Sequence, residues 1–170
     1  MNNQTYSIDN PRPIPDSIKD VIRYCIYTGR LIWLDSKQGR KTNKIEGTDS
    51  SGYIRLTYEG NTYQAHRVAW FIHYGTQPKT LDHVDNVRTN NALHNIRECT
   101  VQQNAWNRKT PCTNTSGCSG VSWHKSKSRW YAFINVNKKR KSLGYHTDID
   151  DAITARRDAE QKYYKEFAPI

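Results

Sequence analysis

Three kinds of side chain that cooperate in phosphate chemistry lie close together near the middle of this chain. Asp82 and His83 are adjacent, and Asn91, Asn95 and Asn104 follow within little more than twenty residues. Hydrolysis of a phosphodiester needs an activated water, a Lewis acid on the phosphate and stabilisation of the leaving oxygen. Neutral imidazole accepts a proton at physiological pH, and carboxylate and amide oxygens suit Mg²⁺ or Mn²⁺. We therefore predict metal-assisted hydrolysis, with His83 as general base and Asp82 and Asn104 holding a single Mg²⁺ or Mn²⁺.

Short elements must position these groups. We expect a short strand over residues 81–84, a turn-rich loop over 85–90 and a return strand over 95–99. Thr100 and Gln103 then predict a capping box that opens a helix, with Asn104 in its first turn or so. Neighbouring side chains of a strand point to opposite faces. Asp82 and His83 can therefore share one metal site only if the backbone is irregular or the ligands meet at its edge.

This region resembles the HNH endonucleases over roughly residues 28–108. The resemblance is carried by Asp82-His83, by the N-x-L-x-N-[IL]-R pattern from Asn91 to Arg97, and by Gln103-Asn104 with Asn107-Arg108. It implies the ββα-metal (His-Me finger) fold, a hairpin and helix that hold one divalent ion, with the ligands meeting at the strand edge. It also implies that Asn95 ties the hairpin loop together and so holds the base in place.

Other polar residues of the region have two interpretations. His66 precedes an apolar helical pattern at residues 68–74 that Gly75 ends, and such a histidine is more often packed than catalytic. Arg97 and Arg108 are candidates for phosphate contact, although exposed arginines are often only solvated.

The charge of the chain favours a polyanionic partner. Lys and Arg outnumber Asp and Glu by 26 to 16, which gives a net charge of +10. No acidic residue lies between Glu98 and Asp148, where nine Lys or Arg occur. A solubility surface usually mixes both signs, so this run predicts a surface that faces phosphates. A merely soluble basic protein is the alternative that charge alone leaves open.

The cysteine spacing and the hydropathy exclude two classes of protein. Cys25, Cys99, Cys112 and Cys118 form no C-x-x-C pair, so we expect no structural zinc. The sequence has no apolar run of membrane-spanning length and no signal peptide, so we expect no membrane partner and a cytoplasmic location, the host cytoplasm if a phage encodes the protein.

The N-terminal part is expected to support the site. Pro11, Pro13 and Pro15 predict a flexible, extended arm, and Asp16 or Ser17 could cap a short helix that ends near Gly29. Strands are expected near residues 31–34, 53–58 and 62–66, the last two forming a hairpin. The loop between the first two is basic and is either solvated or in contact with DNA; its cations are Lys37, Arg40, Lys41 and Lys44.

The C-terminal third has its own pattern. After a polar linker at 109–118, strands are expected near 120–124, 129–136 and 139–145, followed by a helix capped by Thr147 or Asp148. Alternation sends Trp130, Ala132 and Ile134 towards that helix and leaves an aromatic and cationic face open.

Residues 120–169 resemble the apetala-two (ethylene-response-factor type) DNA-binding domain in Gly120-Val121, Arg129–Ile134, Leu143–Tyr145 and the alanine-rich helix. Ser142 stands where the plant domains place a base-contacting Trp, so their target sequence cannot be carried over. A solvated basic hairpin is the alternative. The residues that we predict to contact DNA are Arg97, Arg108, His124, Lys125, Lys127, Arg129, Tyr131, Asn135, Lys138, Lys139 and Arg140.

Together these patterns predict an α+β protein. We expect an arm and short helix at 1–28, an HNH nuclease domain at 29–108, a linker at 109–118 and a three-stranded antiparallel sheet packed on one helix at 119–170. The predicted function is cleavage of double-stranded DNA by a monomer or weak dimer, in the setting of a phage or mobile-element homing-type enzyme. An inactive nucleic-acid-binding regulator on the same fold is the alternative, and a structural protein of a phage particle is a distant third.

Overall fold

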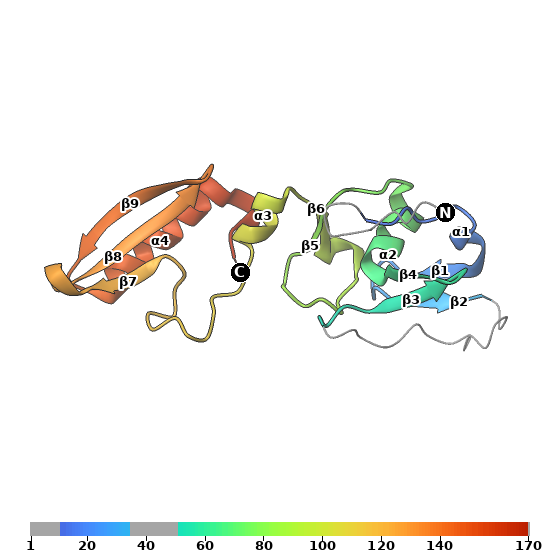
Figure 1. Ribbon diagram of the computed structural model, residues 1–170, viewed down its shortest axis with the longest axis horizontal. Coiled ribbons are helices and arrows are strands. Elements are labelled where there is room, and N and C mark those ends of the chain that lie inside the picture. Colours follow the sequence, from blue (N-terminus) through green and yellow to red (C-terminus); the bar gives the residue numbers. More distant parts are fainter. Residues whose placement is uncertain (1–10, 35–50, 170) are drawn as a thin grey trace. The chain divides into compact units, whose positions relative to one another are not determined.

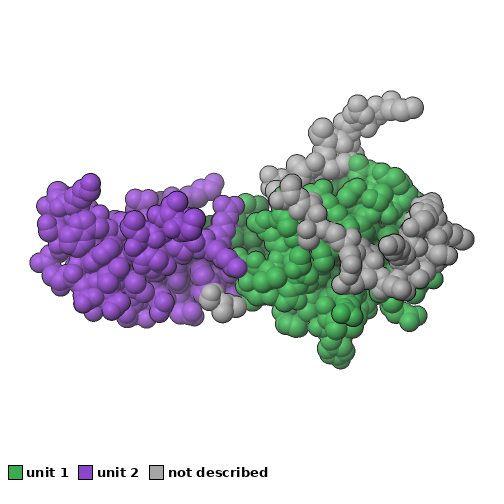
Figure 2. Space-filling view, turned by 90° about the horizontal axis from the view of Figure 1, so that it is seen from below, with its two compact units in different colours: residues 1–104 green, residues 105–170 purple. Residues whose placement is uncertain are grey.

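The computed structural model describes residues 11–34 and 51–169. Its contacts divide the chain into two compact units, Met1–Asn104 and Ala105–Ile170 (Figure 2). Residues 1–10 of the predicted arm lie outside the described residues, as do the loop cations Lys37, Arg40, Lys41 and Lys44. The boundary falls a few residues before the predicted end of the nuclease domain, and the domain assignment stays a prediction.

Unit 1 consists of short antiparallel pairs around a small core (Figure 1). Strand β1 (Ile22–Tyr24) pairs with β2 (Leu31–Trp33), β3 (Arg55–Tyr58) with β4 (Asn61–Gln64), and β5 (Leu81–His83) with β6 (Ile96–Glu98). Helix α2 (Ala65–Tyr74) follows β4 directly and buries Val68, Ala69 and Phe71. The 3₁₀ turn η2 (Leu93–Asn95) leads into β6. The hairpins and the α2 helix that the patterns predicted are confirmed.

The helix predicted from residue 16 or 17 to Gly29 is wrong beyond its first turn. Helix α1 covers only Ile18–Val21, and the chain then extends as β1. Ile18 and Ile22 are both buried in the core of unit 1. Pairing with β2 gives Ile22–Tyr24 backbone partners that a lone helical turn would lack, and this overrides the helical pattern.

The proline-rich segment is also more ordered than expected over its described part. Ile14 is buried in the core of unit 1. Its backbone N–H donates to Oε1 of Gln77 at 2.8 Å, and Nε2 of Gln77 donates to the Ile14 carbonyl at 3.0 Å. The expectation of a flexible arm is therefore wrong around Ile14, because a matched side-chain amide satisfies both of its backbone groups.

Unit 2 is a three-stranded antiparallel sheet, β7 (Val121–His124), β8 (Arg129–Val136) and β9 (Lys139–His146), with helix α4 (Ile149–Tyr164) along one face (Figure 1). The 3₁₀ turn η3 (Lys125–Lys127) lies between β7 and β8, and η4 (Lys165–Phe167) follows α4. The side chain of Asp148 accepts from the backbone N–H of Asp150 and caps α4, as predicted. Ala132 and Ile134 are buried beneath the helix, and the predicted alternation of β8 is confirmed.

Three details of unit 2 did not follow from the sequence pattern. Tyr164 is buried at the end of α4, and its hydroxyl donates to the carbonyl of Asn135 at 3.0 Å. Arg156 is buried on the same helix, where it donates to Glu160 and to the Phe133 carbonyl. The segment predicted as a linker contains Ser116, which is buried and donates to the Val121 carbonyl at 2.7 Å.

Helix α3 (Val101–Trp106) contains the division between the units, which falls after Asn104. Within the described ranges, no helix has both the length and the apolar character needed to cross a membrane.

Candidate active site

The predicted site lies on the β5–β6 hairpin and its loop. The register pairs Asp82 with Arg97 and His83 with Ile96, so β5 is a regular strand. Asp82 and His83 are both buried, and their side chains contact different groups, as expected for adjacent positions of a strand. The hairpin thus presents a carboxylate and an imidazole in two separate environments.

The His83 imidazole is held by a side-chain amide. Nε2 of His83 lies 3.0 Å from Oδ1 of Asn91, and both residues are buried. An amide oxygen only accepts hydrogen bonds, so with this amide orientation Nε2 carries the proton and Nδ1 is the basic nitrogen. Burial lowers the pKa of His83, although the hydrogen bond to Asn91 and the nearby Asp85 and Asp82 act in the opposite direction. The ring is therefore neutral at neutral pH.

The Asn91 segment is in turn held by the β1–β2 hairpin. The hydroxyl of Tyr24 donates to the Asn91 carbonyl at 2.8 Å, and the backbone N–H of Leu93 donates to the Ile26 carbonyl at 2.8 Å. Gly29 has a φ of +70°, and a Cβ there would lie 2.3 Å from backbone atoms of Asn91 and Ala92. Only glycine allows this close approach, so a hairpin distant in the sequence sets the position of Asn91.

His66 is packed against the predicted base. Its ring meets that of His83 edge-on, with centroids 4.9 Å apart, and the ring of Tyr53 lies 5.2 Å from it. Burial, His83 and Arg67 hold the pKa of His66 well below its usual value. The structure places His66 as a buried neighbour of His83, which the sequence pattern did not indicate.

Asn95 ties the hairpin loop together. Its amide nitrogen donates to Oδ1 of Asp85 at 2.9 Å and to the Asn90 carbonyl at 2.8 Å, and its oxygen accepts from the Asp85 backbone N–H at 3.0 Å. The Asp85 carboxylate also accepts from Asn90 and from the backbone N–H of Val87. Burial would raise the pKa of Asp85, but these hydrogen bonds outweigh it and lower the pKa. Sequence reasoning missed Asp85; its position two residues after His83, in a loop rich in Asn, was the available signal.

The Asp82 carboxylate forms an ion pair across the hairpin. Nε and Nη2 of Arg97 both donate to Oδ2 of Asp82, at 3.0 and 2.8 Å. Arg97, predicted to contact a phosphate, therefore binds a carboxylate of its own chain. Arg108, the other arginine of the HNH-like segment predicted to contact phosphate, is exposed.

Asn104 lies where α3 begins. The predicted capping box is confirmed: the Thr100 backbone N–H donates to Oε1 of Gln103 at 2.7 Å, and the Gln103 N–H donates to Oγ1 of Thr100 at 3.1 Å. Burial and the Asp82 carboxylate raise the pKa of Cys99 to about 11, while a hydrogen bond from the backbone N–H of Asn104 acts in the opposite sense. The Cys99 thiol thus lies beside the backbone of Asn104 and is influenced electrostatically by the Asp82 carboxylate.

These oxygen donors suit a hard cation. The described ranges contain no group of three or more His, Cys, Asp or Glu able to hold a metal ion. Asp82 and Asn104 do not form such a group, because an asparagine amide is not among these side chains. They would offer a cation one carboxylate oxygen and one amide oxygen. The raised pKa keeps Cys99 a neutral thiol, which is a poor ligand for Mg²⁺ or Mn²⁺.

The open face of the unit 2 sheet carries an aromatic row, which consists of Lys127, Tyr145, Tyr131, Phe133 and Arg140. The Tyr131 ring stacks on Tyr145 at 4.8 Å and on Phe133 at 5.7 Å between centroids. Nζ of Lys127 lies 3.7 Å from the Tyr145 centroid, and Cζ of Arg140 lies 4.0 Å from that of Phe133. A cationic side chain therefore lies at each end of the row.

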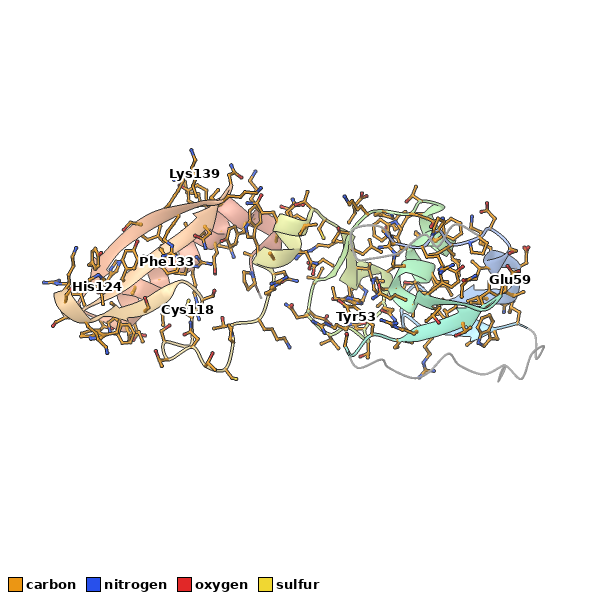
Figure 3. All side chains as sticks on the ribbon, in the orientation of Figure 1. Tyr53, Glu59, Cys118, His124, Phe133 and Lys139 are labelled. Atoms are coloured by element: carbon orange, nitrogen blue, oxygen red, sulfur yellow. The ribbon has the colours of Figure 1, made fainter. Side chains whose placement is uncertain are left out.

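The other residues predicted to contact DNA lie around this row. His124, at the end of β7, packs edge-on against Tyr145 at 5.2 Å, and Figure 3 labels it together with Phe133 and Lys139. The exposed members are Lys125, Arg129, Asn135, Lys138 and Lys139. Tyr145 was not among the predicted contacts, although its register with Tyr131 places it on the same face.

Comparison with known proteins finds similarity to this part of the chain. Residues 63–106 match the HNH endonucleases. The match runs from β4 to the end of α3, so it contains Asp82, His83, Asn95 and Asn104. A stretch of 77 residues is 38% identical to Protein 3.8 of Escherichia phage T7; it covers 44% of this chain and 64% of the phage protein, which is less than two thirds of that protein. No solved structure matches the chain. The resemblance of residues 120–169 to the apetala-two domain stays a prediction.

Proposed function

We propose that this protein is a metal-dependent HNH endonuclease that hydrolyses phosphodiester bonds in double-stranded DNA. The observation that carries the proposal is the His83 imidazole, buried, neutral and oriented by Asn91 on a hairpin that the HNH family match contains. A neutral imidazole can accept a proton at physiological pH, and the hydrogen bond to Asn91 fixes the orientation of the ring.

The chain's own residues would divide the work as follows. Nδ1 of His83 takes a proton from the attacking water, while Asn91 keeps the ring in this tautomer. Asn95 and Asp85 hold the loop that carries Asn91, so they act as positioning residues. His66 fills the space beside the His83 ring and helps to exclude water.

Asp82 and Asn104 are the proposed cation ligands. Two observations support this assignment: the Asp82 carboxylate and the Asn104 backbone both act on the Cys99 thiol, and carboxylate and amide oxygens are hard ligands. A bound Mg²⁺ or Mn²⁺ would polarise the phosphate and stabilise the leaving oxygen.

Unit 2 is proposed to hold the DNA. The aromatic row is rigid because its rings stack on one another, and its end cations can neutralise phosphates on either side of a groove. The surrounding Lys and Arg residues and Arg108 would add contacts to the backbone. The relative in phage T7 supports a phage setting, and we propose a homing or mobile-element role in the host cytoplasm, as a monomer or weak dimer.

One observation favours a second candidate function. In the ion pair with Arg97, the Asp82 carboxylate already has a cationic partner. A protein that kept this pair permanently would bind no catalytic ion and would act as a DNA-binding regulator.

Incubation of supercoiled plasmid with the protein distinguishes the two functions. An endonuclease relaxes or linearises the plasmid with Mg²⁺ or Mn²⁺ and is inactive with EDTA. His83→Ala should lower the rate by about 10³-fold while duplex affinity stays within twofold, because the general base does not bind DNA. His94→Ala is the matched control, an exposed histidine two residues before β6. Binding without cutting under every cation would favour the regulator. Equal losses of cleavage in the two variants would show that His83 is not the general base.

A further inference from the structure

The ion pair between Arg97 and Asp82 crosses the centre of the β5–β6 hairpin. The two residues are direct partners in the register, and both guanidinium donors bind the same oxygen, Oδ2. The side chain of Asp82 is 5% exposed and that of Arg97 17%. Because the pair is shielded from water, the attraction is much stronger than that of a surface ion pair.

A cation at Asp82 would meet the positive charge of Arg97. Two cations on one carboxylate repel each other over a few ångströms, and the burial of the site weakens screening by solvent. Arg97 therefore opposes metal binding for as long as it holds Asp82. A guanidinium released from a carboxylate also has the planar donor geometry that a phosphate accepts.

We propose that Arg97 serves two anions in turn: it binds Asp82 in the free protein and a DNA phosphate once a divalent cation binds Asp82. This inference rests on the proposed function, since it uses the same cation site. It reconciles the sequence expectation that Arg97 contacts phosphate with the observed ion pair. It also makes metal and DNA binding cooperative, because each ligand takes one partner of the same pair.

The test measures binding, with DNA kept intact by the His83→Ala background in the full-length chain. Calorimetric titration gives the Mn²⁺ affinity without DNA, and fluorescence anisotropy gives the affinity for a mixed-sequence duplex with and without Mn²⁺. In Arg97→Gln, Mn²⁺ should bind several-fold more tightly without DNA. The duplex should bind more weakly, and Mn²⁺ should strengthen its binding less than in the parent.

Two further variants separate this mechanism from a loss of charge or of folding. Arg23→Gln removes an exposed cation from β1 of the same unit and should leave both affinities near the parent. Arg97→Lys keeps a charge beside Asp82, so its Mn²⁺ affinity should stay close to that of the parent. If Arg97→Gln lowers the melting temperature, Mn²⁺ should raise it by more than in the parent, because the cation replaces the missing partner of Asp82.

Unchanged or weaker Mn²⁺ binding by Arg97→Gln overturns the inference and makes Arg97 a residue that only orients Asp82. If the parent protein cuts plasmid but Arg97→Gln gives this result, only the inference about Arg97 fails. If the predicted coupling is observed without plasmid cleavage, only the endonuclease proposal fails.

Discussion

The site around His83 and the aromatic row of unit 2 are built in opposite ways. Around His83 the polar groups are buried, and each is held by another: Asn91 by Tyr24, Asn95 by Asp85. The aromatic row lies on a sheet surface among exposed cations. Proton transfer requires one ring in one orientation, whereas attraction to phosphate is shared by many charges. Single substitutions should therefore damage the first region severely and the second only gradually.

The largest effect in this comparison is expected at Asn91. Asn91→Ala leaves the Nε2–H of His83 without its buried acceptor and frees the ring to rotate. We expect plasmid cleavage to fall on the order of 100-fold, because an unoriented base transfers protons poorly, with duplex affinity unchanged. Thr89→Ala, at an exposed position of the same loop, is the control. A loss of cleavage rate below threefold would show that the Asn91 amide does not orient the His83 ring.

Gly29→Ala should have the next largest effect, about tenfold on the cleavage rate. The new Cβ overlaps the backbone of Asn91 and Ala92 and must push the loop away from β1–β2. Gly60→Ala is a matched control, since φ at Gly60 is +72° and nothing lies within 4 Å of an added Cβ. Both variants carry the strain of a positive φ, about 1 kcal/mol. Equal cleavage rates in the two would contradict a role for the close approach.

At the aromatic row we expect a weaker, salt-dependent loss. Replacing Lys127 and Arg140 by Gln together should weaken duplex binding about tenfold at moderate salt and reduce the slope of log K against log salt by about 1.8, since each phosphate contact contributes about 0.9. Lys141→Gln is the control on the same hairpin, because its ammonium lies over Tyr163 of α4 on the opposite face. A similar effect of Lys141→Gln would mean that only total charge matters.

The smallest effect should appear in the pH dependence of stability. The pKa of His66 is lower in the folded protein than in the unfolded chain, so unfolding takes up a proton as the pH falls below the ordinary histidine value of about 6.5. His66 stabilises the fold fully above that pH and loses this contribution below it, by up to about 1.4 kcal/mol per pH unit.

His66→Phe removes this term and should flatten the decline in the urea midpoint between pH 7.5 and 5. His73→Gln, an exposed histidine of α2, should leave the slope unchanged. An identical slope in His66→Phe and the parent would show that His66 is not held neutral.

Much of the local structure was predictable, because it depends on neighbouring residues. The Thr100–Gln103 capping box, the Asp148 cap and the alternation of β8 all follow from groups a few residues apart. The helix predicted beyond Val21 failed because the following strand, β2, pairs with Ile22–Tyr24. The packing of Ile14 could not be foreseen either, since it depends on Gln77, more than sixty residues later.

By itself the sequence determined which chemical groups are present and how they are spaced: an acid next to a base, amides at fixed intervals, and a basic, aromatic strand. Spacing determines this much because short hairpins and caps form from adjacent residues. Three contacts became visible only in the folded chain: Asn91 orients the His83 ring, the close approach of Gly29 fixes the position of Asn91, and Arg97 binds Asp82. Such contacts depend on which segments pack together, and packing is the outcome of the whole chain's burial and backbone pairing.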